Sequence, residues 1–184
     1  MARIKSININ AGHNAAGQNA CGAVGLLNES KENRKVAKRV IKNLKKAGLT
    51  VYNCTVDKAP SQRDNLINIC KLCEAHKVDL NVFIHFDSGV TDFVGDGKTT
   101  GTSCMVRTNS GIRKKAADSI RKEISALGFR DRGTHERSDL YVLNHTSAPC
   151  VLIECCFVND IDDKKRYNYK TMADAITRAI LAVK

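Results

Sequence analysis

The chain has 184 residues, of which 42% are hydrophobic, and a formal net charge of +11. This length and hydrophobic fraction predict one domain over residues 1–184 with a sizeable core. Its longest apolar runs, 82–86 and 151–153, are far too short to cross a bilayer, so a membrane span is excluded. The excess of Lys and Arg is compatible with a polyanionic partner or with a merely solvated basic surface. Because only 5% of residues are aromatic and Trp is absent, no nucleic-acid partner is expected.

Residues 1–10 alternate apolar and polar side chains and lack the apolar core and cleavage site of a secretory signal. They predict a first strand and synthesis in the cytoplasm. The eight cysteines are therefore expected to be reduced. Cys70 and Cys73 form a CxxC pair, but no second ligand pair follows at zinc-finger spacing, so we interpret them as two residues on the buried face of a helix.

The predicted elements alternate between strands and helices, which favours a parallel sheet covered by helices. The first half is predicted to contain a strand over 4–10, a small-residue loop over 11–17 and a helix over 29–47 that ends at Gly48. A strand over 49–54, a helix opened by Pro60 and Ser61, and a buried strand over 79–87 follow. The glycine-rich segment 88–101 is predicted to be a long active-site loop.

The second half begins with a strand over 103–107 and a helix from Ser110 to Gly128. The charged segment 130–138, which contains His135, is expected on the surface near the site. Strands are predicted at 140–143 and 151–153, and an amphipathic helix at the C-terminus. The expected fold is a single α/β domain, with a twisted, mostly parallel sheet of about six strands and helices on both faces.

Four polar residues, His13, Glu29, His85 and Glu154, fall at the ends of strand-like runs or in the first turn of a helix. An α/β sheet builds its active site at such positions. Two imidazoles and a carboxylate are able to hold one Zn²⁺ with a coordination position left open, and a second carboxylate is able to move protons. The pattern indicates a metal-dependent hydrolase.

Considered one at a time, the four residues differ in how strongly each indicates a functional site. His13 is unremarkable alone, and Glu29 after Asn28 also fits a structural first-turn carboxylate stabilised by the helix dipole. His85 interrupts a buried apolar run, where an imidazole needs a partner. Glu154 lies between two apolar runs and must be desolvated, so it is expected to meet a strong partner or to have a raised pKa.

The chain resembles the zinc-dependent N-acetylmuramoyl-L-alanine amidases of the amidase-3 type, found among phage endolysins and bacterial autolysins. The resemblance covers nearly the whole length and includes the Gly-His at 12–13, the helix-opening Glu29 and the strand ending in His85. Its strongest part is the segment 149–159, PCVLIECCFVN, which is similar to the family pattern Pro-x-x-Leu-x-Glu-x-x-Phe-x-Asn.

By that resemblance His13, Glu29 and His85 are the ligands of one Zn²⁺, and Glu154 is the catalytic carboxylate. The implied substrate is the amide bond between N-acetylmuramic acid and L-alanine in peptidoglycan, in the wall of a Gram-positive bacterium. The implied setting is an enzyme without a signal peptide that acts at the wall after release. Two departures from the family pattern, Asn14 for Gly and Asp87 for Asn, leave the ligands in place; the roles of Asp87 and His135 stay open.

Other motifs do not match. Residues 97–99, Gly-Lys-Thr, are similar to the end of a P-loop, but Asp92 stands where that loop needs its first glycine. The zinc-deaminase Pro-Cys-x-x-Cys pattern is absent after Pro149. Two alternatives remain: another zinc peptidase or carboxypeptidase on a similar sheet, and a non-catalytic basic module that binds wall polymer or nucleic acid.

Overall fold

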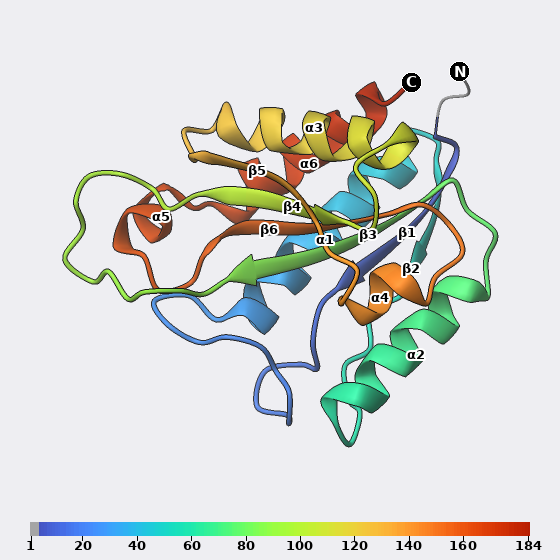
Figure 1. The fold of residues 1–184 in the computed structure, drawn as a ribbon, viewed down its shortest axis with the longest axis horizontal. Helices are drawn as coiled ribbons and strands as arrows, with labels where there is room; N and C mark the ends of the chain where they lie inside the picture. The colour runs from blue at the N-terminus through green and yellow to red at the C-terminus, as the bar shows by residue number, and fades with distance from the viewer. Residues whose placement is uncertain (1–3) are drawn as a thin grey trace.

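A six-stranded sheet with the order β2-β1-β3-β6-β4-β5 runs through the computed structural model, which describes residues 4–184 (Figure 1). The strands are β1 (Ser6–Ala11), β2 (Thr50–Asn53), β3 (Leu80–Asp87), β4 (Thr102–Val106), β5 (Asp131–Glu136) and β6 (Cys150–Phe157). Strands β4 and β5 are parallel to each other and antiparallel to the other four, which are mutually parallel. The predicted mostly parallel sheet is confirmed.

Helices cover both faces of this sheet, as predicted. One face carries α1 (Glu29–Lys46), α3 (Gly111–Ser125) and α6 (Tyr169–Ala182), and the other carries α2 (Gln62–Glu74) and α4 (Tyr141–Asn144). A sixth helix, α5 (Ile161–Arg166), follows β6. In Figure 1, α3 and α6 lie together above the sheet, and α2 and α4 lie together below it. In the described part of the chain, no helix combines the length and apolarity that a membrane span needs.

The central strands are buried on both faces, because successive side chains of a strand point to opposite sides. Val82 and Ile84 of β3 join the large core under α1, α3 and α6, whereas Phe83 joins a smaller core under α2 and α4. In β6, Leu152 joins the smaller core in the same way. Side chains that share this parity therefore point toward α2 and α4, and these include His85 of β3 and Glu154 of β6.

Capping residues set the helix ends near the predicted positions. Asn28 accepts a hydrogen bond from the backbone N–H of Lys31 at 3.0 Å at the start of α1, and Ser61 accepts one from Asp64 at 3.1 Å at the start of α2. Gly48, with φ +89°, ends α1 in the left-handed conformation that a side chain disfavours.

Three predicted elements differ in the structure. The run 140–143 was predicted as a strand but belongs to the short helix α4, because so short an apolar run has no period that separates a buried helix from a buried strand. The segment 130–138 was predicted to lie on the surface near the site, with no strand assigned to it; most of it is the edge strand β5, whose charged side chains suit a sheet edge. Helix α5 was not predicted, although Asp160 caps it by accepting from two backbone N–H groups.

Asp79, which directly precedes β3, forms hydrogen bonds with the start of β1. Its carboxylate accepts hydrogen bonds from the backbone N–H groups of Lys5 and Ser6, at 2.8 and 2.9 Å, and these bonds lower the pKa of Asp79. A lowered folded-state pKa contributes stability above the unfolded pKa of about 4, and this contribution is lost as the pH falls through the folded-state pKa.

We therefore expect Asp79→Asn to lower the free energy of unfolding at pH 7 by no more than about 1 kcal/mol, because the carboxylate is exposed. The difference from the unmodified chain should begin to shrink as the pH falls below about 4 and should vanish once the pH is below the lowered folded-state pKa of Asp79. Urea unfolding at several pH values measures it. A difference that stays constant with pH would show that the charge of Asp79 contributes nothing.

Candidate metal centre and cavity

The four predicted site residues lie together at the C-terminal ends of the parallel strands. His13 follows β1, Glu29 is the first residue of α1, and His85 and Glu154 are neighbours in the register of β3 and β6. His85 and Glu154 lie within their strands, two and three residues before the last, and not beyond the end of the apolar run as predicted. They point into the site because alternate side chains of a strand lie on the same face of the sheet, and not because the strands end there.

Glu29 lies between the two histidines. Its Oε1 is 3.0 Å from His85 Nδ1 and 3.2 Å from His13 Nε2, and one ligand atom from each residue lies within 4.8 Å of the others. Burial raises the pKa of Glu29, but hydrogen bonds with His13 and His85 outweigh it and hold this pKa far below its usual range. Two imidazole nitrogens and one carboxylate oxygen form a donor set that fits Zn²⁺.

Backbone groups hold the Glu29 carboxylate from both sides. The N–H of Phe86 donates to Oε1 at 3.1 Å, and the N–H of Ala23 donates to Oε2 at 2.8 Å.

His13 has a φ of +65°, in the left-handed region that L-residues rarely adopt. The conformation of His13 is therefore imposed by its surroundings and not by its own preference.

Side chains in the first two turns of α1 hold the backbone of His13 and its neighbours in this conformation. Asn33 donates to the carbonyl of Gly12 at 2.8 Å, and Arg34 donates to the carbonyl of His13 at 2.9 Å. Ser30 donates to the carbonyl of Asn14 at 2.8 Å. The helix that supplies Glu29 thus also positions His13.

Asn14, one of the two departures from the family pattern, has a structural role here. Its side-chain N–H₂ donates to the carbonyls of Asn19 and Ala59, and its oxygen accepts from Asn65 of α2 at 2.7 Å. Asn14 is fully buried, so these bonds satisfy a polar group that would otherwise be costly to bury. The residue ties the His13 loop to α2.

Gly12 leaves the space that the ring of His85 occupies. A Cβ at position 12 would lie 2.1 Å from His85 Cε1, far closer than two carbon atoms approach. We expect Gly12→Ala to displace the imidazole and to lower catalytic activity and zinc content, with activity about 100-fold lower. Metal content and initial rates of the purified variant measure this.

Gly17→Ala is the matched control for that substitution. Gly17 has φ +86°, but no atom lies within 4 Å of a Cβ placed there. Only backbone strain of about 1 kcal/mol is expected, with zinc and activity retained. If both variants lost activity equally, the contact between Gly12 and His85 would not be the cause.

Glu154 is flanked on neighbouring strands by His85 and Ser103. Its Oε2 is buried and has no hydrogen-bond partner among the described residues, and the same is true of Ser103 Oγ. Burial, followed by the charges of Asp87 and Glu29, raises the pKa of Glu154 well above its usual range. The side chain is therefore a half-buried carboxyl group whose Oε2 is shielded from solvent, so it readily holds a proton and has a free acceptor position.

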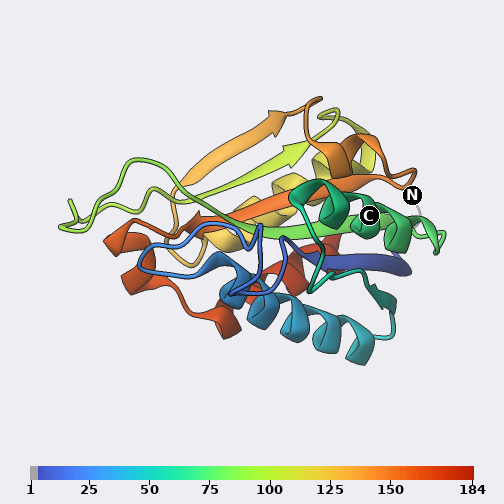
Figure 2. The ribbon, with the colours of Figure 1, turned by 90° about the horizontal axis from the view of Figure 1, so that it is seen from below.

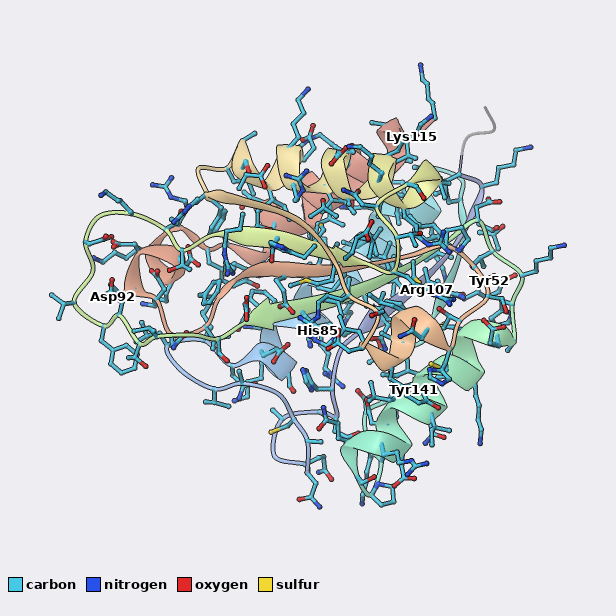
Figure 3. The ribbon with its side chains drawn as sticks, viewed as in Figure 1. Tyr52, His85, Asp92, Arg107, Lys115 and Tyr141 are labelled. Carbon is cyan, nitrogen blue, oxygen red and sulfur yellow. The ribbon has the colours of Figure 1, made fainter. Side chains whose placement is uncertain are left out.

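A cavity of about 370 Å³ opens beside these residues. His13, His85 and Glu154 lie on one side, and α2 and α4 supply the other side, including Tyr141, which Figure 3 labels together with His85. The lining combines apolar and polar side chains; among the lining residues are Gln62, Asn65, Leu66, Ile69, Arg137, Asp139, Leu140 and Leu152. The sequence did not predict this wall, because residues 140–143 were expected to form a strand.

Asp87, the second departure, pairs with an arginine on the edge strand. Arg132 Nη1 donates to Asp87 Oδ2 at 3.0 Å, and the same guanidinium lies 4.6 Å from the centre of the Phe157 ring. Asp87 does not line the cavity. His135, on β5 opposite Met105, is exposed and does not line it either.

The segment 88–101 is irregular, as predicted, but it is not an active-site loop, because none of its residues lines the cavity. It projects from one end of the molecule beside α5 in both ribbon views (Figures 1 and 2). Asp92, which it carries, lies well away from His85 in Figure 3. Asp92, Asp96 and Asp162 converge there, but Asp92 and Asp162 accept hydrogen bonds from backbone N–H groups of the loop.

An open parallel sheet with a His–Glu–His donor set and an adjacent buried carboxyl group at its C-terminal edge has the architecture of an α/β metal-dependent hydrolase. The chain belongs to the N-acetylmuramoyl-L-alanine amidase family Amidase_3, whose model matches residues 7–183. The resemblance found in the sequence is therefore confirmed.

The chain is also similar to individual proteins and to a solved structure. Uncharacterized protein CPE1502 of Clostridium perfringens is 33% identical over 168 residues, which cover 89% of this chain and 47% of that protein. N-acetylmuramoyl-L-alanine amidase LytC of Bacillus subtilis is 28% identical over 179 residues, 96% of this chain and 34% of that protein. The solved structure of Cwp6 from Clostridium difficile matches with a TM-score of 0.82 and 25% identity, over 99% of this chain and 29% of that chain. The chain spans about half the length of the Clostridium perfringens relative.

Proposed function

We propose that this chain is an N-acetylmuramoyl-L-alanine amidase, which hydrolyses the amide bond between the lactyl group of N-acetylmuramic acid and L-alanine in peptidoglycan. The observation that carries the proposal is the meeting of His13, Glu29 and His85 with Glu154 at one side of a cavity, in a chain of this family. Such a set of side chains performs hydrolysis and not mere binding.

His13, Glu29 and His85 are proposed to hold one Zn²⁺ per chain. The pKa of Glu29, lowered by the two histidines, supports this because a metal ligand must be deprotonated. When bound, Zn²⁺ polarises the scissile carbonyl and makes water more acidic. The backbone N–H groups on Glu29 and the bonds from α1 to residues 12–14 keep the three donors oriented before the metal arrives.

Glu154 is proposed to move the proton. Its free Oε2 accepts a proton from the attacking water and then delivers it to the nitrogen of the departing L-alanine, so that the alanine leaves as an amine. A carboxyl group with a raised pKa suits both steps, because it holds the proton between them. The neighbouring strand position of His85 places this carboxyl group beside the proposed ligands.

The stem peptide is proposed to lie in the cavity against its apolar lining residues Leu66, Ile69 and Leu152. The exposed Gln62 of α2, which also lines the cavity, offers an amide group, which suits a peptide backbone. The volume of about 370 Å³ falls in the range of sites that take a short peptide or another small ligand.

Incubation with purified cell walls tests the assignment. New amino groups of N-terminal alanine are expected, in proportion to the loss of turbidity, and without new reducing sugar. Walls that yield only reducing sugar would refute the amidase. New amino groups on residues other than alanine would instead assign the chain to the zinc peptidases.

We further propose that the substrate is the wall of a Gram-positive bacterium and that the enzyme lyses it after release from the cell in which it is made. The relatives from Clostridium and Bacillus support this choice of wall. Walls from a Gram-positive species should lose turbidity faster than peptidoglycan of a Gram-negative species at equal concentration. The reverse order would contradict the proposal.

A further inference from the structure

One side of α1 carries six lysines and no other charged residue. At about 100° per residue, all six fall within an arc of about 100°, opposite the buried Val36, Val40 and Leu44. All six are exposed, and in Figure 2 α1 (blue to cyan) forms the lower edge of the molecule. We name this set the lysine stripe: Lys31, Lys35, Lys38, Lys42, Lys45 and Lys46.

The charges of the lysine stripe are almost uncompensated. Lys35 pairs with Glu32 at 2.7 Å, and within residues 4–184 the other five have no carboxylate at ion-pair distance. The two arginines of the helix, in contrast, form ion pairs with other segments, Arg34 with Asp57 and Arg39 with Asp174. Helix α1 has eight Lys and Arg against two Glu, so it carries more than half of the net charge of +11.

An open groove of about 530 Å³ runs beside the stripe. Lys38 and Lys45 line it on the α1 side, and Asn53 and Thr55, at and after the end of β2, line it on the other. From Lys31 to Lys45 the stripe extends about 21 Å, with successive charges about 4.5 to 6 Å apart along the axis. This is a linear track of positive charge and not a pocket for a single anion.

We infer that the lysine stripe and its groove bind a linear polyphosphodiester that the cell wall carries. Lysine suits such a ligand, because its ammonium group is a point charge that requires no fixed geometry from a flexible chain of phosphates. Nucleic acid is the less favoured polyanion, since neither the stripe nor the groove lining contains an aromatic side chain for base stacking.

The stripe and the catalytic cavity lie on opposite faces of the sheet, because α1 packs with α3 and α6 whereas α2 and α4 line the cavity. Helix α1 also begins with Glu29, a proposed metal ligand, and Lys31 lies within the same turn. A polymer bound along α1 would therefore hold the chain at the wall without covering the cavity. This inference rests on the proposed function, because it assumes that peptidoglycan is the surface to which the chain must be held.

The experiment compares two triple variants of equal net charge. The stripe variant is Lys38→Gln, Lys42→Gln and Lys45→Gln; the control replaces Lys77, Lys122 and Lys164, exposed lysines of three other segments, in the same way. Binding of the full chain on ice to Gram-positive walls is measured by co-sedimentation, before and after acid removal of the phosphodiester polymer. Alanine release is assayed separately, so that a failure of the amidase assignment is distinguishable from a failure of binding.

The stripe variant should bind intact walls at least about tenfold more weakly than the unmodified chain, and the control within about twofold. Removal of the polymer should bring the unmodified chain to the level of the stripe variant. Both variants should hydrolyse a small soluble muramyl peptide at the unmodified rate. Equal loss in both variants, undiminished binding to stripped walls, or tighter binding to duplex DNA than to intact walls would each overturn the inference.

Discussion

Glu154→Gln is expected to lower kcat by about 1,000-fold and to leave zinc content and thermal stability unchanged. The substitution keeps the size and shape of the side chain but removes the group that accepts the proton of the attacking water. Because Oε2 has no hydrogen-bond partner among the described residues, no contact of the fold is lost. The raised pKa of Glu154 has the same origin as its proposed role, namely burial beside the charges of Asp87 and Glu29.

Three measurements test this prediction: alanine release from walls, metal content and the melting temperature. Glu136→Gln is a suitable control, because Glu136 is an exposed carboxylate on β5 that does not line the cavity. The control should retain full activity. A Glu154→Gln protein as active as the unmodified chain would remove Glu154 as the proton carrier and would leave the metal assignment untouched.

His85→Ala and His13→Ala are each expected to lose zinc and activity together. With one imidazole gone, the donor set falls to two, which does not hold a metal at micromolar concentration or below. Activity should fall to the level of a zinc-free sample, and added zinc should no longer raise the melting temperature of either variant, because binding to the native state is what stabilises it.

His135→Ala is the control for the histidine variants, since His135 is exposed on β5 and lies outside the cavity. It should keep about one zinc per chain, a stoichiometry that follows from a single His–Glu–His set. If His85→Ala kept its zinc and lost only activity, His85 would act on the substrate and the ligand set would need revision. Loss of zinc from His135→Ala alone would place the metal elsewhere.

The fold was predicted well where a long periodic pattern or a distinctive cap marks an element. Asn28 and Gly48 bracket α1, and the apolar run before His85 gives β3, because burial and capping leave a local pattern in the chain. The prediction failed where the signal was short: residues 140–143 are a helix and 131–136 an edge strand. A run of four to six residues does not specify whether it forms a helix or a strand, so its tertiary contacts decide its secondary structure.

In the candidate site, too, some residues could be predicted from the local sequence and others could not. His85 and Glu154 stand out as polar residues in buried runs, so the sequence alone marks them as special. His13 was a modest candidate from its position, and Glu29 was raised from a structural first-turn carboxylate to a candidate ligand by the family resemblance. Arg137, Asp139 and Tyr141 line the cavity but were missed, because nothing local indicates that α4 and the residues before it fold against the cavity. Their position beside the cavity depends on where two distant segments meet.

The sequence by itself determined the fold class, the family and the four residues of the candidate site, because periodicity, composition and a conspicuous motif are local properties of the chain. The tertiary structure alone decided that Glu29 lies about 3 Å from both histidines, that Asp87 pairs with Arg132, and that α2 and α4 close a cavity over Glu154. It also showed that, within the described residues, five of the six lysines of α1 have no ion-pair partner whereas both of its arginines have one. Distances between segments tens of residues apart are set by the packing of the whole core, which no local pattern encodes.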